Sequence, residues 1–555
     1  MSNFVSLLNT TYSNDYIENI INKENDVPKI SLKNVGLKIL MSQNNKDTSQ
    51  MFSTTKSNIN PIYNDNIILL CYGEIYNSKE LFNYMDIEPT TQYSYEIIIH
   101  LYKRFGIEHT LRMIDGTFSF LLLDNNVESE NFKLYVARDS YGVKPLYILN
   151  PILRTFINDI NNRDDPILGF STDKHMLYEL YKKINSNNYL NKKENKFCYE
   201  LKSFLPGTYS SIILSSKILS SWITKRGNIK FHMHGFNSLM YSIHSQYNDN
   251  IIIENIQNYI SRSIDKRCKL YGSSKFVCYL NGEIQNNILA GLVNEYNLMN
   301  HLPTLKTYSI GLKDSDQLIN AKKVADYLKT EHTEFILNED FFLKESLESI
   351  LDLECYNDFS KLNVCNMKSK TPTPSINNVE KCALKSQTNN IDYIEYIHQY
   401  FIGKYIKNDD ITYIFNGNGI NQLFGSLHLF SFKTPPSGAV MSGEGDADFA
   451  SKMRNGVNSI QDPIQYDLFI RNSIEKIFLN ELFISDLSLY YNGIIPSSPF
   501  LDRSFVEYYL SIPPQIRFDK ETKEIDKYFL RMAFSEDYFM NHENMPLLPH
   551  DIIFL

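Results

Sequence analysis

Residues 276–290 (FVCYLNGEIQNNILA) combine a short apolar segment with a polar turn and the start of a helix. At such a junction in an α/β sheet, the backbone N–H groups of the helix N-terminus can bind an anion such as a phosphate. The turn has one glycine and several polar residues: Asn281, Gly282, Glu283, Gln285 and Asn286. A loop that holds nucleotide phosphates normally has more glycine and a carboxylate for magnesium. The stretch therefore has the position of a nucleotide loop without its usual chemistry.

The elements around this stretch predict a parallel sheet. Isoleucines at 253, 256, 260 and 264 recur every three or four residues, as in an amphipathic helix. Further strands are expected at 305–311 and 411–415, with helical segments between them. Alternating strands and helices favour a doubly wound α/β fold, in which ligands bind at the carboxyl ends of the strands. Asn281 and Asn416 both follow such ends.

The first half of the chain predicts a different architecture. Residues 67–72 (IILLCY) are apolar and β-prone, whereas 95–105 can form a helix with isoleucines and a leucine on one face. Residues 118–124 and 132–137 predict two strands of a hairpin across a polar turn. Residues 1–150 therefore predict mainly strands and turns with few helices.

Composition narrows the class of protein. A chain of 555 residues is long enough for two or more domains. Its net charge of -9 argues against nucleic acid as a partner, and no apolar run is long enough to span a membrane. Seven cysteines without paired spacing, and an N-terminus unlike a signal peptide, indicate a soluble protein of a reducing, cytoplasmic compartment.

Four motifs follow one another in the first half: CYGEIYNSKEL, MIDGTFSFLLLD, LYVARDSYGVKPLY and FLPGTY. Together they resemble the class II glutamine amidotransferase domain of the asparagine synthetase family. The resemblance implies an α+β sandwich of the N-terminal-nucleophile (Ntn) type over residues 1–210. In that family, a cysteine at the start of the mature chain hydrolyses glutamine, with the chain's own α-amino group as base.

The glutamine pocket implied by the resemblance is altered. Ser2 stands where the nucleophile is expected, and the first cysteine in the chain, Cys71, is predicted to be a small buried residue of a strand. The family's N-G-E becomes Tyr72, Gly73 and Glu74, so a phenol replaces an oxyanion-binding amide.

Two charged partners of the substrate are also replaced. Ser94 takes the position of the aspartate that pairs with the substrate's ammonium, and Ile39 that of the arginine that pairs with its carboxylate. Each lost charge-assisted contact typically costs about 1.5–3 kcal/mol, so we expect no glutaminase activity. The matching residues that remain are interpreted as framework: Asp115, Gly116, Arg138, Asp139, Gly142, Pro145, Pro206 and Gly207.

The second half continues the resemblance. The segments TYSIGLKDSDQLINAKKVADYLKTEHTEF, IFNGNGINQLFGS, PSSPFLDRSFVEYYLSIPP and KEIDKYFLR follow in the family's order. They imply an ATP-pyrophosphatase synthetase domain over 250–555, without the basic tail of the family. In active members, this domain adenylates the side chain of aspartate and lets ammonia displace AMP. Residues 211–249 between the two halves are rich in Ser, Lys and Asn without clear periodicity, and we expect them to be a linker.

The nucleotide motifs implied by the resemblance have lost their acids. The family's SGGLDS, whose aspartate binds magnesium, corresponds to the turn from Asn281 to Asn286, and Gln285 takes the place of that aspartate. The family's SGEGSDE corresponds to Asn416–Gln422, in which uncharged residues replace all three acids. Its matching residues include Gly417, Gly419 and Asn421. Magnesium prefers carboxylate oxygens, so we expect no metal ligands here.

Two cations and one acidic loop remain to be considered. Lys527 and Arg531 match the family's catalytic lysine and its neighbour one turn on, although a solvated helix face with two cations would look the same. The acid and arginine that usually precede P-F-L-D are Ile495 and Ser497. Residues 442–448 (SGEGDAD) superficially resemble the lost acidic motif, but they lie in an apparent insertion at 436–465. We interpret them as an exposed acidic loop.

Three hypotheses follow. The favoured one is a pseudoenzyme that keeps the fold as a scaffold, regulatory partner or structural component, with no cofactor. The second is a ligase that makes asparagine from aspartate, ATP and free ammonia, with Lys527 and Arg531 acting on ATP at an atypical magnesium site. The third is a non-catalytic module that binds a nucleotide or an amino acid. By resemblance, a homodimer or a hetero-assembly with an active copy is expected.

Overall fold

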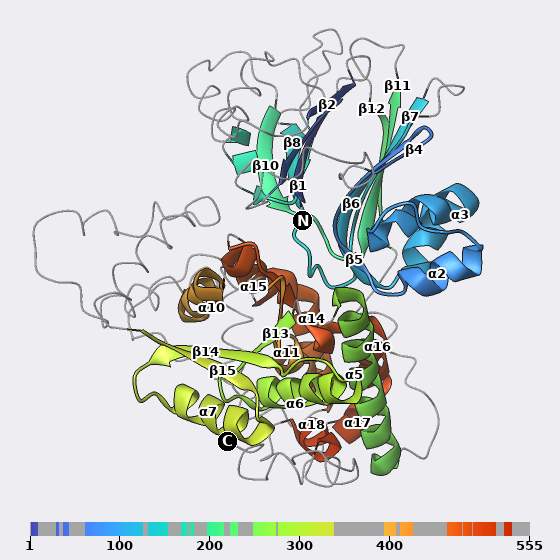
Figure 1. Cartoon of the computed structure of the whole chain (residues 1–555). Coiled ribbons are helices and arrows are strands. Elements are labelled where there is room, and N and C mark those ends of the chain that lie inside the picture. Colours follow the sequence, from blue (N-terminus) through green and yellow to red (C-terminus); the bar gives the residue numbers. More distant parts are fainter. Residues whose placement is uncertain are drawn as a thin grey trace, which may run out of the picture. The chain divides into compact units, whose positions relative to one another are not determined.

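Figure 1 shows the computed structural model of the chain. The described residues are 2–8, 29–32, 37–43, 62–125, 131–153, 168–174, 177–178, 180–181, 197–215, 223–230, 248–272, 276–337, 393–406, 411–425, 463–479, 481–490, 492–517 and 527–534. Those before position 233 form one compact unit and those after position 234 form another. The domain boundaries drawn from the sequence stay predictions.

The first unit contains two antiparallel six-stranded sheets. One has the order β10-β8-β9-β1-β3-β2 and the other β12-β11-β7-β6-β5-β4. The strands of the first sheet are β1 (Ser2–Leu8), β2 (Lys29–Leu32), β3 (Leu37–Gln43), β8 (Tyr147–Leu153), β9 (Leu168–Ser171) and β10 (Phe197–Ser203). The strands of the second are β4 (Ile62–Asn64), β5 (Ile67–Ile75), β6 (Gly116–Asp124), β7 (Asn131–Arg138), β11 (Thr208–Ser215) and β12 (Ile223–Lys230).

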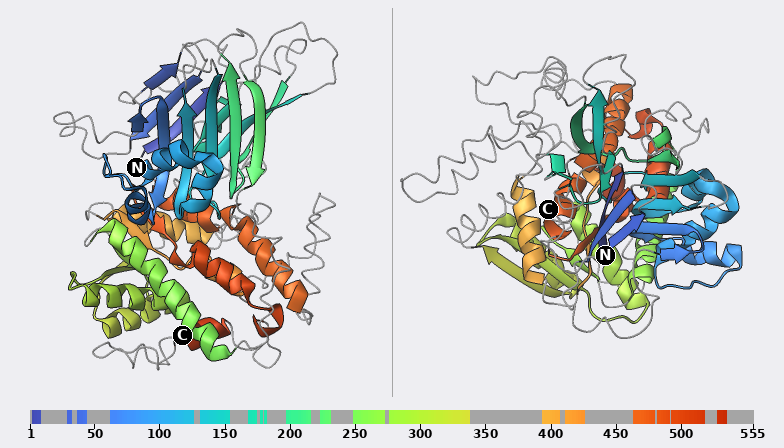
Figure 2. Two further views of the ribbon diagram at one scale, coloured as in Figure 1. Left: turned by 90° about the vertical axis from the view of Figure 1, so that its right-hand side faces the viewer. Right: turned by 90° about the horizontal axis from the view of Figure 1, so that it is seen from above.

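The second sheet of this unit is buried on both faces. Along β5, Leu70 belongs to an apolar core shared with β1 of the first sheet, whereas Leu69 and Cys71 belong to a second core. Helices α2 (Ser78–Met85) and α3 (Ile97–Met113) contribute to that second core. Successive side chains of a strand point to opposite faces, which explains why β5 has apolar residues at consecutive positions. Figure 2 shows the resulting layers of the unit, a sandwich of two sheets.

Several expectations for this unit are confirmed. Strand β5 includes residues 67–72, strands β6 and β7 pair as the predicted hairpin, and α3 includes most of the helix expected at 95–105. One expectation was incomplete: strand β12 lies inside the segment 211–249 that composition marked as a linker. It extends the sheet by antiparallel pairing with β11, so backbone hydrogen bonds rather than an apolar pattern determine this strand.

The second unit is built on a parallel five-stranded sheet of order β15-β14-β13-β16-β17. Its strands are β13 (Phe276–Tyr279), β14 (Lys306–Leu312), β15 (Glu331–Leu337), β16 (Tyr413–Phe415) and β17 (Ile495–Ser497). The chain adds β14 on one side of β13 and β16 on the other, so the strand order reverses between β13 and β16. In open α/β sheets, ligands bind at such a reversal. The predicted parallel sheet is confirmed.

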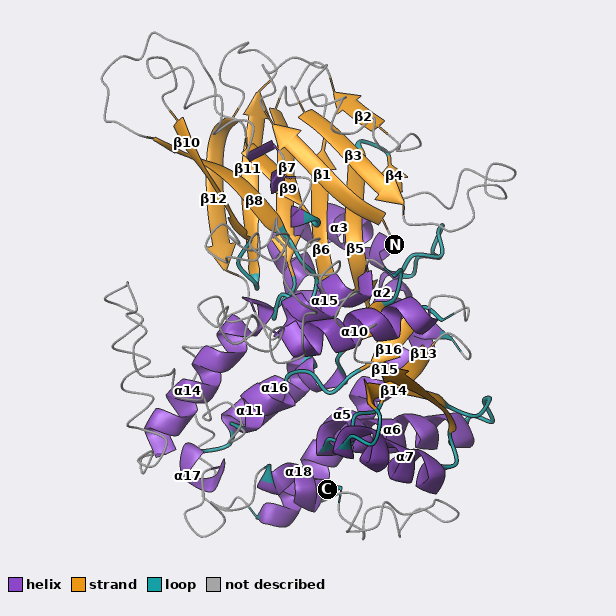
Figure 3. Cartoon of the chain, turned by 90° about the vertical axis from the view of Figure 1, so that its left-hand side faces the viewer, coloured by secondary structure: helices purple, strands orange, loops and turns teal. Residues whose placement is uncertain are grey.

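Helices cover this sheet, as Figure 3 shows. Helix α6 contacts β13, α7 contacts β14 and β15, and α10 contacts β14. The helices are α5 (Asp249–Tyr271), α6 (Ile284–Met299), α7 (Asp316–Leu328), α10 (Tyr393–Ile406), α11 (Ile420–Phe424), α14 (Pro463–Lys476), α15 (Glu481–Tyr490), α16 (Arg503–Ser511), α17 (Pro514–Arg517) and α18 (Tyr528–Ala533). The amphipathic helix expected around 253–264 is α5. It buries Ile256, Ile260 and Ile264.

Candidate functional site

The turn between β13 and α6 is held closed by side-chain amides. Asn281 accepts hydrogen bonds at Oδ1 from the backbone N–H of Glu283 (3.1 Å) and from Nδ2 of Asn286 (2.7 Å). Gly282 has a φ of +78°, and a Cβ there would lie 2.7 Å from Cβ of Asn320 on α7. The glycine is therefore required by the backbone conformation and by the close approach of a helix.

The turn between β16 and α11 lies against the first turn. The backbone N–H of Gly417 donates to Oδ1 of Asn286 at 2.8 Å. A Cβ at Gly417 would lie 2.4 Å from Cγ of Gln285, so only a glycine permits this contact. The structure thus brings the two sequence-predicted loops together at the carboxyl ends of β13 and β16. Along the second loop, Gly419 has a φ of +97° and contacts Leu501.

Lys527 reaches the same place from a third segment. Its Nζ donates to Oε1 of Gln285 at 3.1 Å, and Nε2 of Gln285 donates to the carboxylate of Glu283. Lys527 and Gln285 are buried, at 7% and 3% exposure, whereas Glu283 is exposed. Lys527 precedes α18 with a φ of +59°, and Arg531 follows one turn later, its N–H bonded to the carbonyl of Lys527. The buried lysine and its side-chain contact contradict a fully solvated pair of cations.

Glu481 is a site residue that the sequence analysis missed. It lies at the start of α15, and its Oε2 accepts a long hydrogen bond (3.4 Å) from the N–H of Gly419. Burial raises the pKa of Glu481 to about 7, although hydrogen bonds from Gln422 and Gly419 act to lower it. The charge of Glu283 raises this pKa further, while that of Lys527 lowers it. An isolated acid at the start of an apolar helix, in a chain whose motif acids are gone, was the available signal.

The P-F-L-D segment serves the fold. Asp502 caps α16 by accepting from the N–H of Ser504, and its carboxylate pairs with Lys266 and Arg267 of α5. Burial raises the pKa of Asp502, but these two cations outweigh it and hold the pKa below its ordinary value. Nearby, Ser497 of β17 shares a hydrogen bond with the hydroxyl of Tyr271 (2.8 Å). These residues join α5 to the end of the sheet.

In the first unit, the expected glutamine pocket is lined by packed side chains. Tyr72 is 1% exposed, and the ammonium of Lys144, also 1% exposed, lies 4.9 Å from the centre of its ring. A Cβ at Gly73 would lie 2.1 Å from a carbonyl oxygen of β6, so this glycine is explained by close strand packing. Glu74 is buried on β5, and the hydroxyl of Ser94 accepts from a backbone N–H of the same strand at 3.0 Å.

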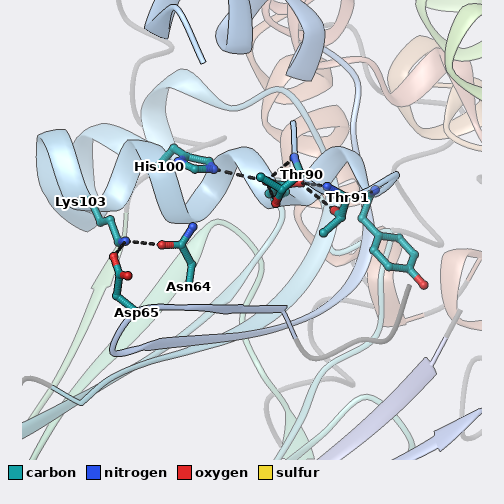
Figure 4. A network of polar contacts seen from close by, with 8 residues as sticks. Asn64, Asp65, Thr90, Thr91, His100 and Lys103 are labelled. Atoms are coloured by element: carbon teal, nitrogen blue, oxygen red, sulfur yellow. Dashed lines mark hydrogen bonds and ion pairs between the residues drawn. The ribbon is translucent and has the colours of Figure 1, made fainter. Parts of the chain in front are cut away.

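A carboxylate two residues after Ser94 is also engaged. Glu96 accepts four hydrogen bonds of 2.6–2.9 Å from the backbone and hydroxyl groups of Thr90 and Thr91, and His100 lies 3.4 Å away (Figure 4). Burial raises the pKa of Glu96, but these hydrogen bonds outweigh it and lower the pKa below its ordinary value. The hydrogen bonds of this carboxylate therefore stabilise the turn that contains Thr90 and Thr91.

The retained framework residues of this unit hold a turn. Arg138 donates to the carbonyl oxygens of Gly142, Lys144 and Phe204 at 2.7–2.8 Å. Asp139 accepts from the three backbone N–H groups of residues 141, 143 and 144. Cys71 is buried as predicted, and burial raises the pKa of its thiol well above the ordinary value, as expected of an inert core cysteine.

Some predicted features lie outside the described residues, namely the acidic segment 442–448 with its Asp446 and Asp448, and the rest of the insertion at 436–465 up to position 462. Within the described ranges, no group of three or more His, Cys, Asp and Glu residues is placed to hold a metal ion. No helix in those ranges combines the length and apolar character needed to cross a membrane.

Comparison with known proteins adds to this geometry. The glutamine amidotransferase domain family matches residues 47–157, and the asparagine synthase family matches residues 261–359 and 468–540. Asparagine synthetase [glutamine-hydrolyzing] of Gallus gallus is 28% identical over 490 residues, which cover 87% of this chain and 70% of that protein. The Homo sapiens enzyme is 26% identical over the same shares of both chains.

Among solved structures, an NH3-dependent NAD synthetase from Campylobacter jejuni aligns with 50% of this chain and 97% of its own, at 15% identity. Its TM-score of 0.20 is too low to support an argument. The two family matches, by contrast, occur in the order expected from the motifs, one before position 233 and the other after position 234. The alignments with the Gallus gallus and Homo sapiens proteins cover 87% of this chain. This protein therefore belongs to the asparagine synthetase family.

Proposed function

We propose that this protein is a non-catalytic member of its family, acting as a scaffold, regulatory partner or structural component. The observation that carries the proposal is the engagement of Gln285, at the position where the resemblance implies a magnesium-binding aspartate. Its oxygen accepts from the ammonium of Lys527 at 3.1 Å, and its nitrogen donates to Glu283. A neutral amide with both ends bonded inside the protein has no free charge to offer a metal ion.

The remaining amides do not fit magnesium either. The ion prefers oxygen ligands and is usually held through one or two carboxylates together with substrate phosphates. Oδ1 of Asn421 is buried and has no hydrogen-bond partner among the described residues, but it is the oxygen of a neutral group. Because Gln285 and Asn421 replace both implied carboxylates, the electrostatic support for metal-assisted adenylation is lost. We therefore derive no adenylation step through this site.

Two carboxylates do lie near these amides, but their settings differ from those of metal ligands. Glu283 accepts the hydrogen bond of Gln285, and Glu481 accepts that of Gly419. Since burial raises the pKa of Glu481 to about 7, a large fraction of this group is protonated at neutral pH. A partly protonated carboxyl that already accepts backbone and side-chain hydrogen bonds is a poor ligand for a hard cation.

The amidotransferase half supports the same conclusion. Tyr72 and Lys144 are packed against each other where the resemblance implies an oxyanion-binding amide. Ser94 has no charge to pair with the ammonium group of glutamine, and the carboxylate of Glu96 already accepts hydrogen bonds from two threonines. Strand β1, which begins at Ser2, contains no cysteine. Both reactions of the relatives thus lack polar groups that their chemistry needs.

An assay of AMP release tests the proposal. The full-length protein is supplied with aspartate, ATP and magnesium, with either ammonia or glutamine as nitrogen donor, and we expect no AMP above background. The same assay is run on Lys527→Ala, which removes the ammonium group bonded to Gln285. Turnover by the wild type that Lys527→Ala abolishes would establish the ammonia- or glutamine-dependent ligase and refute the proposal.

A restored variant makes a negative result informative. Gln285→Asp combined with Asn421→Asp returns carboxylates to both implied ligand positions. We expect MgATP to raise the Tm of this variant and to leave the wild type unchanged, since a ligand stabilises only a fold that binds it. Stabilisation of the wild type by MgATP would instead favour a nucleotide-binding module. The role of a non-catalytic protein then rests on a partner, for which a second copy or an active homologue in the cytoplasm is the first candidate.

A further inference from the structure

Three side chains form a continuous polar chain between α6 and α18. Glu283 precedes α6, Gln285 lies in its first turn, and Lys527 precedes α18. The ammonium of Lys527 donates to Oε1 of Gln285 at 3.1 Å, and Nε2 of Gln285 donates to the carboxylate of Glu283. We name these three residues the internal lock. Gln285 and Lys527, which make its buried contact, are 242 residues apart in sequence, so the internal lock forms only in the folded unit.

The backbone holds Lys527 in the position that this contact needs. Its φ of +59° is left-handed, a conformation that costs a residue with a Cβ about 1–2 kcal/mol. Such a conformation persists where surrounding contacts determine it. Here the next residues of α18 are buried, including Phe529 and Leu530 at 3% and 0% exposure. The helix anchors the lysine, and the lysine side chain is directed to Gln285.

The charges around the lock oppose an anion. Glu283 is linked to Lys527 through a single amide, and Glu481 is close enough for both groups to influence its ionisation. A phosphate approaching Lys527 must displace Oε1 of Gln285 and come close to two acidic groups. Like charges at such separations cost free energy, and more so where water is partly excluded.

From this geometry we infer that the internal lock is an autoinhibitory contact, in which Gln285 and Glu283 take the place of a bound oligophosphate on Lys527. Release of the lock would expose an anion site that the wild type keeps closed. This inference rests on the proposed non-catalytic function, and it gives the buried ammonium of Lys527 an acceptor inside the protein. Gln285 supplies the acceptor, and Glu283 orients the amide by accepting from its nitrogen.

Binding of inorganic tripolyphosphate tests the lock without magnesium or nucleotide. Titration calorimetry at low salt measures the affinity for tripolyphosphate of the wild type and of a double variant that combines Glu283→Ala with Gln285→Ala. We expect the double variant to bind at least about tenfold more tightly, because the anion gains a charge-assisted contact and loses a repulsion. Adding Lys527→Met should remove the gain. Glu507→Ala is the matched control, since it removes one acidic side chain from the surface of α16 in the same unit.

Equal binding by the wild type and the double variant would overturn the lock, as would a gain that survives Lys527→Met. If the double variant does not fold, Glu283→Gln carries the test: it keeps an acceptor for Gln285, removes the charge, and should still bind several-fold more tightly than the wild type. These outcomes are distinct from failure of the proposed function, which would appear as AMP release by the wild type whatever its affinity for tripolyphosphate.

Discussion

Replacing Glu481 by glutamine should stabilise the second unit at alkaline pH and leave it unchanged in acid. Burial raises the pKa of this carboxyl to about 7 from an ordinary value of 4.5. The charge of Glu283 adds to the shift, while hydrogen bonds from Gln422 and Gly419 and the charge of Lys527 oppose it. The folded state therefore holds a proton on Glu481 at pH values where the unfolded chain has released it.

The sign and the size of the effect follow from this difference. Between pH 4.5 and about 7, the folded state binds more protons than the unfolded state, so stability falls as pH rises through that window. The stability linked to the proton is fully present below pH 4.5 and is lost above pH 7. A difference between 4.5 and about 7 corresponds to about 3 kcal/mol. For a unit of this size, this equals roughly 6 °C in Tm.

Glu481→Gln removes the charge and keeps the shape. Its amide oxygen can still accept from the N–H of Gly419. Its amide nitrogen can donate to Oε1 of Gln422, a buried atom to which no described residue donates a hydrogen bond. Scanning calorimetry of the full-length protein at pH 4 and pH 8 should give nearly equal Tm values for the second unit at the lower pH. At the higher pH, the variant should unfold roughly 6 °C above the wild type.

The matched control is Glu475→Gln, the same replacement at an exposed position of α14. It should leave Tm unchanged at both pH values. If Glu481→Gln and wild type differ by the same amount at pH 4 and pH 8, the carboxyl does not hold its proton in the folded state. The reasoning from burial would then be refuted.

Two other substitutions test the frameworks of the two units. Asp467→Asn should cost about 3–5 kcal/mol at pH 7 in urea titrations, because it leaves two buried guanidinium groups, of Arg471 and Arg517, without their carboxylate. Burial raises the pKa of Asp467, but the two arginines outweigh burial and hold the pKa below its ordinary value. The wild type, unlike the variant, should therefore lose this stability as pH falls below 3.8. Parallel plots of stability against pH for the two proteins would contradict this. Gly73→Ala should destabilise the first unit by about 3 kcal/mol in thermal melts, since its Cβ would lie 2.1 Å from a backbone oxygen. Gly106→Ala, also at a positive φ but in open space, should cost less, and equal losses would exclude the clash as the cause.

The parts of the fold that could be predicted are those with a local signal. Strand β13 is a short apolar run before a polar turn, and α5 has isoleucines at helical spacing. Both loops at the sheet reversal were recognisable for the same reason. Strands β12 and β17 were not, since β12 is polar and β17 is only three residues long. Their pairing with neighbours in the sheet, rather than their own pattern, makes them strands.

The candidate site shows the same division. The amides at positions 285 and 421 could be identified from motif spacing, whereas the contact between Gln285 and Lys527 joins residues 242 positions apart. Glu481 was missed because nothing next to it in sequence resembles a motif; helix packing brings it to Gly419. The buried state of Lys527 could not be predicted either, because its i,i+4 spacing with Arg531 suits an exposed helix face equally well.

The retained lysine and the lost acids have different physical explanations. A buried ammonium needs an acceptor, and Gln285 supplies one, so the fold alone accounts for Lys527 once α18 has anchored its backbone. The fold does not account for the amide. An aspartate at position 285 could pair with the same lysine at least as strongly, since hydrogen bonds between charged groups are stronger than those to an amide. Stability therefore gives no reason to replace the acid, whereas the proposed non-catalytic function, which needs no metal ion, does. This asymmetry is why the lysine cannot be used as an argument for surviving catalysis, and why the amide at 285 is the more informative residue.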